Sequence, residues 1–258
     1  MSAARGRAEA GGEGRAALAP FVLALDTSHP RGSVAVARGE DLFCEVIFDA
    51  SDTHSATLLP AVDVCLRNAK VALEKIERIA VVTGPGSFTG LRIGLATAKA
   101  FAAAHGAAVV PVGSLEALAA AFPFAGAPVL PLIDARRGEV YAACYRTEKG
   151  LPECVMPVLA TAPERLAERL GSAGIEGALV VCGTGALRYR EVLEPMLPRG
   201  TRFAGARWAV PAASLTALIA LGRPQLTGAD LVALEPLYVR PPDARLPADA
   251  RLGECGGS

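Results

Sequence analysis

Two short segments place an aspartate at the end of an apolar run, beside a turn. The first, Asp26-Thr27-Ser28, follows the apolar residues 21–25 and precedes a glycine, Gly32. The second begins at Asp134, after the apolar residues 129–133. A strand-end carboxylate beside hydroxyl groups can position Mg²⁺-bound water or phosphate oxygens. The pattern therefore indicates contact with a nucleotide or another anion or, as the alternative, tight turns that serve only the fold.

The turn after Asp134 carries two bulky cations, Arg136 and Arg137. Arginines at this place argue against ordinary MgATP binding, although one of them could contact an anionic ligand or a carboxylate of a partner. A third turn, Gly183-Thr184-Gly185, has the small residues that let an adenosine approach the backbone. The alternative for this turn is again a tight connection between a strand and a helix.

The chain offers little for metal-dependent or nucleophilic catalysis. Its three histidines are His29, His54 and His105, and no two of them lie within one helical turn. A lone histidine cannot build a transition-metal site without other ligands nearby. Ser87 stands in a glycine-rich turn, but its setting is not the G-x-S-x-G of a nucleophile elbow. We therefore predict no metal site, no catalytic residue and no peptidase chemistry.

The composition is that of a globular protein. The 258 residues are 52% apolar and 20% charged, with 26 basic and 26 acidic residues. A dedicated nucleic-acid binder would normally show a basic excess, so we expect contact with nucleic acid to be at most indirect. The six cysteines form no C-x-x-C pair, which indicates buried free thiols in a reducing compartment. No apolar run approaches the length of a membrane span, so we expect a cytoplasmic protein.

Strands and helices alternate between two low-complexity ends. Residues 1–19 and 241–258 are predicted to be disordered tails, with a start codon assigned too early as the alternative for the first. Apolar patterns predict strands at 21–25, 32–37, 42–48, 79–82, 108–112, 129–133, 139–145 and 179–182. Helices are predicted at 54–70, 89–104, 163–170 and 212–221. Two further helices are predicted, one that Ser114 can cap and that runs to Phe122, and one after Gly185. Thr161 and Glu164 have the spacing of a capping box.

The pattern of strand, aspartate, turn and strand occurs twice. Residues 21–25 end in Asp26 and residues 129–133 end in Asp134, and each aspartate is followed by a glycine that precedes a strand. This repeat indicates two similar lobes, which we place at residues 20–112 and 113–240. The last helix, 212–221, is a candidate for completing the first lobe.

The segment Gly84–Gly94 joins a strand to a helix with small residues on one face. Ser87 or Thr89 can cap this helix, and Gly90, Gly94, Ala98 and Ala102 then follow at every fourth position. Glycine inside a helix costs roughly 1 kcal/mol relative to alanine, so close packing should require it. The packing is either against the sheet of the same lobe or within an intermolecular helix bundle. On the second reading, Gly94→Leu should block partner binding and leave folding intact.

The chain resembles the TsaB (YeaZ) family from about Phe21 to about Arg240. The segments that carry the resemblance are Leu23–Val36, His54–Pro60, Gly84–Gly94 and Ile133–Tyr141, and the string GPGSFTGLRIG is the most specific part. The resemblance implies an α/β fold of two lobes, with mixed sheets flanked by helices. This is the actin-like ATPase fold, of the ribonuclease H-like, Hsp70 and sugar-kinase type.

The resemblance also implies a function. The family supplies a non-catalytic subunit for making threonylcarbamoyladenosine in bacterial tRNA, and it was once grouped with glycopeptidases. Its catalytic relative, TsaD, transfers the threonylcarbamoyl group to the adenosine next to the anticodon. The implied partners are TsaD in a heterodimer, the ATPase TsaE and a second copy in a homodimer, with tRNA only indirectly. No cofactor is implied beyond ATP or ADP at a complex interface. An independent ATPase and a peptidase are the alternatives.

Two sets of residues follow from the resemblance. Family members pair through two helices, which correspond here to 54–70 and 89–104. The implied partner surface comprises His54, Leu58, Val62, Phe88, Gly90, Leu91, Gly94, Ala98 and Ala102. The implied degenerate nucleotide or anion site comprises Asp26, Thr27, Ser28, Gly32, Asp134, Arg136, Arg137, Gly183 and Gly185. TsaD binds its metal with two histidines one helical turn apart, whereas here Leu58 follows His54. We expect Asp26 to be solvated, as strand-end carboxylates usually are.

Overall fold

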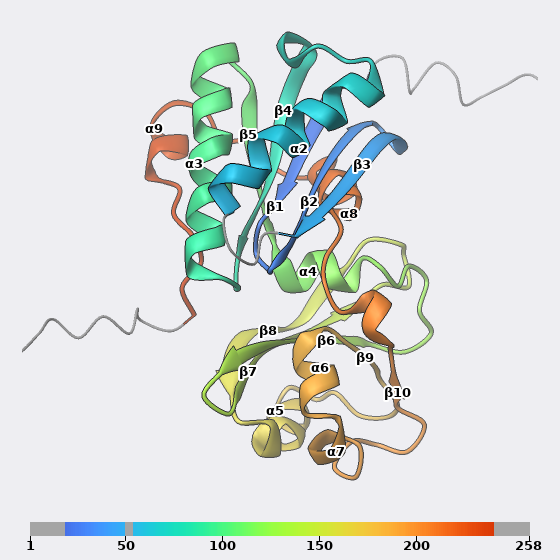
Figure 1. The fold of residues 1–258 in the computed structure, drawn as a ribbon. Helices are drawn as coiled ribbons and strands as arrows, with labels where there is room; N and C mark the ends of the chain where they lie inside the picture. Colours follow the sequence, from blue (N-terminus) through green and yellow to red (C-terminus); the bar gives the residue numbers. More distant parts are fainter. Residues whose placement is uncertain (1–18, 50–53, 240–258) are drawn as a thin grey trace, which may run out of the picture.

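A computed structural model describes residues 19–49 and 54–239, and of residues 54 and 55 it describes the backbone alone. The predicted tails lie outside these ranges, except for Ala19. The described chain forms two five-stranded sheets with helices packed on both faces of each (Figure 1). This confirms the α/β fold of two lobes, with mixed sheets flanked by helices, that the sequence predicted.

The first sheet has the strand order β3-β2-β1-β4-β5. Its strands are β1 (Phe21–Asp26), β2 (Arg31–Arg38), β3 (Asp41–Asp49), β4 (Ile76–Gly84) and β5 (Ala108–Gly113). β1, β2 and β3 pair antiparallel, and β1, β4 and β5 pair parallel. The predicted hairpin turn between Arg38 and Asp41 is confirmed. Because β1 lies at the centre, the end of β1 at Asp26 is surrounded by the rest of the lobe.

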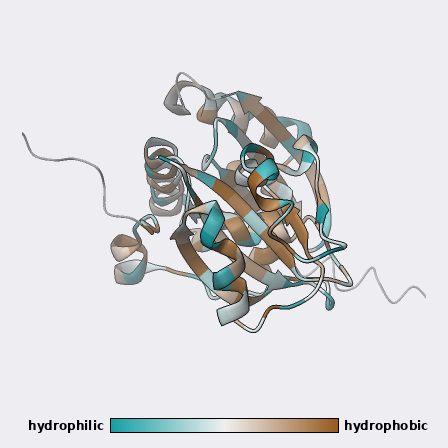
Figure 2. Ribbon diagram, turned by 90° about the horizontal axis from the view of Figure 1, so that it is seen from below, coloured by the Kyte–Doolittle hydropathy of each residue, from teal (hydrophilic) through white to brown (hydrophobic). Residues whose placement is uncertain are grey.

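Alternate residues of β1 face two separate cores. Leu23 and Leu25 pack beneath α2 (His54–Ala69) and α3 (Phe88–His105), which lie side by side on one face. Val22 and Ala24 pack beneath α8 (Ala213–Ala220) on the other face. This division follows from the two-residue period of a strand, which sends successive side chains to opposite faces. Viewed from below, the strands are mostly hydrophobic (Figure 2).

The second sheet has the order β10-β9-β6-β7-β8. Its strands are β6 (Val129–Arg136), β7 (Glu139–Arg146), β8 (Glu153–Thr161), β9 (Val180–Cys182) and β10 (Arg202–Phe203). One face packs against α5 (Leu166–Ser172), α6 (Thr184–Arg188) and α7 (Arg190–Leu193). The other packs against α4 (Ser114–Ala119), which also contacts β4 and β5 and so lies between the two sheets (Figure 1). Short 3₁₀ helices occur at Leu73–Lys75, Pro163–Arg165 and Ala206–Trp208.

The C-terminal part of the described chain returns to the first sheet. Leu226 pairs with Val109 on the outer strand β5. The short helix α9 (Gly228–Ala233) follows, and the chain then runs beside α3 (Figure 1). Lys99 Nζ donates to Val232 O at 2.8 Å, and Leu237 N donates to Thr83 O at 2.8 Å. None of the helices in the described ranges is long and apolar enough to cross a membrane.

Some local predictions were wrong. Ser114 is not a cap, since Gly113 precedes the helix and the Ser114 hydroxyl donates to Pro85 O instead. The capping box of Thr161 and Glu164 does not form, because Thr161 is the last residue of β8 and the N-cap position falls on Ala162. β8, β10 and α9 were not predicted at all.

Candidate functional site

The turn after β1 buries its polar side chains. Asp26, Thr27 and Ser28 are each only 1% exposed. Asp26 Oδ1 accepts hydrogen bonds from Ser28 N at 2.8 Å and from Ser28 Oγ at 2.6 Å. Within residues 19–49 and 54–239, the other oxygen, Asp26 Oδ2, is buried with no hydrogen-bond partner. The expectation that Asp26 is solvated was therefore wrong.

This burial changes the acidity of Asp26. Burial disfavours the charged carboxylate and raises the pKa of Asp26 to about 6. The two hydrogen bonds from Ser28 oppose this rise, and the negative charge of Glu45 adds to it. The group can therefore take up a proton near neutral pH inside the first lobe.

His29 continues the buried network and was not predicted to belong to it. Its Nδ1 lies 2.8 Å from Ser28 Oγ. Burial, with the charge of Arg31, lowers the pKa of His29 to about 4, so the ring is neutral at pH 7. The Ser28 hydroxyl has one hydrogen. When it donates this hydrogen to Asp26, His29 Nδ1 must be protonated and must donate to Ser28 Oγ. In a hydrolase triad the histidine lies between the acid and the serine. Here Ser28 lies between the acid, Asp26, and the histidine, His29.

The same turn is pressed against the start of α3. Thr27 Oγ1 donates to Gly90 O at 2.7 Å, and Ser87 N donates to Ser28 O at 2.7 Å. A Cβ atom added at Gly94 would clash with Thr27 Oγ1, and one added at Gly86 would clash with the Ser28 carbonyl. These glycines are required by close packing within one lobe.

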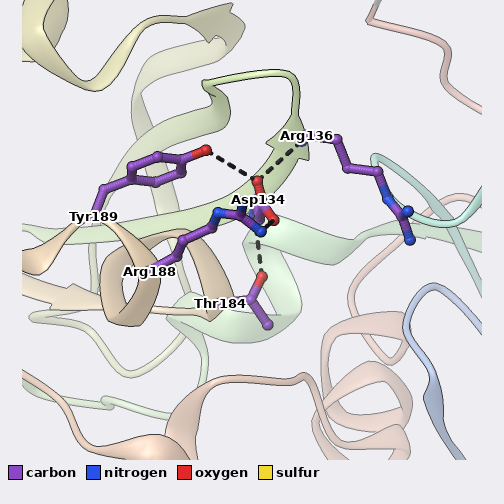
Figure 3. Close-up of polar contacts among 5 residues, drawn as sticks. All are labelled: Asp134, Arg136, Thr184, Arg188 and Tyr189. Atoms are coloured by element: carbon purple, nitrogen blue, oxygen red, sulfur yellow. Dashed lines mark hydrogen bonds and ion pairs between the residues drawn. The ribbon is translucent and has the colours of Figure 1, made fainter.

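Asp134 of the second lobe is held differently, by a cation (Figure 3). Its Oδ2 forms an ion pair with Arg188 NH1 at 3.0 Å. Its Oδ1 accepts from Arg136 N at 3.0 Å and from Tyr189 Oη at 3.4 Å, and its backbone N donates to Thr184 Oγ1 at 3.1 Å. The carboxylate is thus neutralised from within the chain. Sequence reasoning did not predict Arg188 or Tyr189 here; their only signal was their position just after Gly183-Thr184-Gly185.

The predicted arginine turn is a tight hairpin with its side chains outside. Arg136, Arg137 and Gly138 have φ values of +61°, +54° and +78°. Such angles are uncommon for residues other than glycine. Both arginines are exposed, and the Arg136 side chain points away from Asp134 (Figure 3).

The remaining residues of the predicted anion site pack within their own lobes. Gly183 and Gly185 are buried where α6 meets β6, and an added Cβ at Gly183 would clash with Leu132 O. Gly32 has no room for a Cβ because the Phe48 ring lies over it. The structure therefore gathers the predicted residues into two separate clusters, around Asp26 and around Asp134. In the described ranges, no three His, Cys, Asp or Glu side chains gather as a metal site would need.

The predicted partner surface divides into buried and exposed positions. Most of its members are buried residues of α2 and α3: Leu58, Val62, Gly90, Leu91, Gly94, Ala98 and Ala102. Phe88 is 40% exposed. The side chain of His54 lies outside what the structure describes. Leu59, 52% exposed, and Val64 were not predicted, and they add apolar side chains to the outer side of α2.

Phe88 is the base of an aromatic and cationic stack. The Arg92 guanidinium lies 3.7 Å from the centre of the Phe88 ring, and Arg92 Nε donates to Tyr238 Oη at 3.0 Å. The Phe88 and Tyr238 rings are 5.3 Å apart. The cation–π contact with Phe88 and the hydrogen bond to Tyr238 hold the arginine at the surface.

Comparison with known proteins gives the family. Residues 48–202 match a family model described as "TsaD: tRNA N6-adenosine threonylcarbamoyltransferase". The chain is 35% identical over 168 residues to the tRNA threonylcarbamoyladenosine biosynthesis protein TsaB of Escherichia coli, over 64% of this chain and 71% of that protein. The chain belongs to the TsaB (YeaZ) family.

Further relatives agree with membership of the TsaB family. TsaB of Bacillus subtilis is 38% identical over 136 residues, which are 53% of this chain and 59% of that protein. TsaB of Haemophilus influenzae is 40% identical over 131 residues, or 50% and 55%. These alignments span a little over half of both relatives. The crystal structure titled "YeaZ from Pseudomonas aeruginosa" has a TM-score of 0.71 at 30% identity and covers 85% of this chain and 99% of that one.

Proposed function

We propose that this chain is a non-catalytic scaffold subunit of the bacterial machinery that forms threonylcarbamoyladenosine in tRNA. Membership of the TsaB family supports a place in that pathway. In this proposal the chain binds the catalytic subunit TsaD, pairs with itself when TsaD is absent, and has the ATPase TsaE as a further partner. It acts in the cytoplasm and meets tRNA only through the complex.

The observation that carries the non-catalytic role is the state of the two strand-end aspartates. Asp26 is buried beneath α3, and Asp134 is paired with Arg188. A metal ion, including the Mg²⁺ that accompanies a bound nucleotide, would need one of these carboxylates to be accessible and unpaired. This arrangement argues for support rather than chemistry, and against an independent ATPase. Any ATP or ADP would then bind at a junction with another subunit.

We place the partner on the exposed sides of α2 and α3. Leu59, Val64 and Phe88 expose apolar side chains there, and the stacked Arg92 adds a fixed cation. Aromatic and arginine side chains dominate the binding energy of many interfaces. TsaD would dock on this face. The docking face therefore adds exposed side chains to the partner surface that the family resemblance implies.

Matched substitutions test the docking face. Leu59→Glu on α2 should weaken binding of TsaD from the same organism at least tenfold in isothermal titration calorimetry. Leu42→Glu on β3, at a similarly exposed leucine, should leave the affinity unchanged. Equal affinities for both variants would exclude this face. Tight MgATP binding by the isolated chain would instead favour the independent ATPase.

A further inference from the structure

The turn Thr27-Ser28 and the start of α3 fit together through four contacts. Two are hydrogen bonds, from Thr27 Oγ1 to Gly90 O and from Ser87 N to Ser28 O, both at 2.7 Å. Two are places where only glycine fits, at Gly86 and at Gly94. The contacts join segments about sixty residues apart in the sequence and cover the first two turns of an 18-residue helix.

The turn itself is held rigid by Asp26. The carboxylate accepts from both the backbone and the hydroxyl of Ser28, which is the geometry of an Asx turn extended by one hydrogen bond. His29 Nδ1 reaches the same hydroxyl from the other side. All four residues from Asp26 to His29 are buried.

A phosphate-binding turn needs the opposite arrangement. Its hydroxyl and amide donors must point toward solvent, where an anion can reach them. Here the Thr27 hydroxyl is committed to Gly90 O and the Ser28 hydroxyl is shared between Asp26 and His29. Asp26 Oδ2, which has no hydrogen-bond partner among the described residues, is a carboxylate oxygen that would repel phosphate.

We propose that the Asp26–His29 turn supports α3 rather than a ligand, and that Thr27 and Ser28 are positioning residues for the partner surface. Thr27 sets how close α3 lies to the sheet, and Ser28 fixes the residue that caps the helix, Ser87. The outward direction of Phe88 and Arg92 follows from that position. The inference rests on the proposed function, since α3 carries part of the docking face.

The test compares two buried threonines in the isolated chain and in the complex. Thr27→Val keeps the side-chain shape and removes the hydroxyl. Thr147→Val is the matched control, because Thr147 is also buried and its hydroxyl donates to Phe122 O at 2.6 Å in the second lobe. Thr27→Ser retains the hydroxyl and should rescue. The readouts are amide hydrogen exchange at residues 88–96 without partner, the affinity for TsaD, and MgATP binding.

We expect Thr27→Val to speed exchange at residues 88–96 by about three- to tenfold, the factor that matches one net hydrogen bond. Its affinity for TsaD should fall about fivefold or more, because the docking face loses its preorganisation. Thr147→Val and Thr27→Ser should behave as the unchanged chain in both measurements.

Three results would overturn the inference. The first is that Thr27→Val leaves amide exchange at residues 88–96 as it was. The second is that Thr27→Val speeds this exchange but does not alter the affinity for TsaD. The third is that the unsubstituted chain binds MgATP and Thr27→Val abolishes this binding. If the unchanged chain does not bind TsaD at all, the proposed function fails. The exchange of α3 without partner would still show whether the turn supports this helix.

Discussion

At the scale of single residues, the two aspartates show how one motif can be neutralised in two ways. Asp26 is buried, and burial raises its pKa to about 6. Asp134 keeps a partly accessible side chain and is paired with Arg188. Each solution removes a free carboxylate from the surface. The first also leaves a group whose protonation is coupled to folding.

The pH dependence of stability should report on Asp26. The folded pKa is raised to about 6 from 3.8, so the folded chain holds a proton that the unfolded chain releases. The resulting stabilisation is fully present below about pH 4 and is lost as the pH rises through 6. Asparagine does not titrate. As the pH rises from 4 to 7.5, the free energy of unfolding of Asp26→Asn should therefore increase by roughly 2–3 kcal/mol relative to that of the unchanged chain.

Urea unfolding of both proteins at several pH values measures this difference. Subtracting the two curves cancels the other carboxyl groups, and Glu45, His29 and Arg31 are the charged or titratable neighbours that shift Asp26 or lie beside it. Parallel curves for the two proteins would show that Asp26 keeps an ordinary pKa.

Cysteine reactivity gives a second test at this scale. Burial raises the pKa of the Cys65 and Cys144 thiols to about 12, and it also raises the pKa of Cys182. The thiolate is the reactive form, so these residues should resist alkylation in the native chain. Among the cysteines of residues 19–49 and 54–239, Cys154 is the exposed one and should be modified before the others. The measurement is peptide mapping after brief iodoacetamide treatment at pH 8. Labelling of Cys144 or Cys182 as fast as that of Cys154 would contradict the prediction.

At the scale of elements, α3 has an inner face fitted to its own sheet and an outer side with exposed residues. The stripe of Gly90, Gly94, Ala98 and Ala102 is on the inner face. This packing within the lobe was one of the two readings of the stripe. Its exposed residues include Phe88 and Arg92, and Arg92 donates a hydrogen bond to Tyr238 of the C-terminal segment.

Gly94→Leu should consequently affect folding as well as binding. The sequence alone predicted a folded variant that cannot bind its partner. Because a Cβ atom at position 94 already clashes with Thr27 Oγ1, we now expect a loss of about 1–3 kcal/mol or more in the free energy of unfolding. Thermal unfolding of the variant measures this directly. An unchanged melting temperature would mean that α3 can shift away from Thr27 at little cost.

Phe88→Ala should separate binding from stability. The ring is 40% exposed, so its removal should cost less than about 1 kcal/mol of stability while weakening TsaD binding about tenfold or more. Phe124→Ala, at a 74% exposed ring in the second lobe, is the control. Equal TsaD affinity for the two variants would remove Phe88 from the docking face.

At the scale of the whole molecule, the sequence and its family resemblance predicted most of the architecture. The repeated strand and aspartate predicted two lobes because apolar runs and turn residues are local signals. The environment of each aspartate was not predictable, because it depends on contacts between distant segments. Thr27 meets Gly90, and Asp134 meets Arg188, 54 positions later. The edge strands β8 and β10 and the short helix α9 were missed for a related reason, since none of them has a long periodic pattern.

The central claim is that this chain works by binding a catalytic partner. The most direct measurement is the mass of the purified chain mixed with TsaD from the same organism, by light scattering after size exclusion. The account predicts a heterodimer that replaces a self-dimer, and its loss in Leu59→Glu. Separate elution of the two proteins, with and without nucleotide and TsaE, would contradict it.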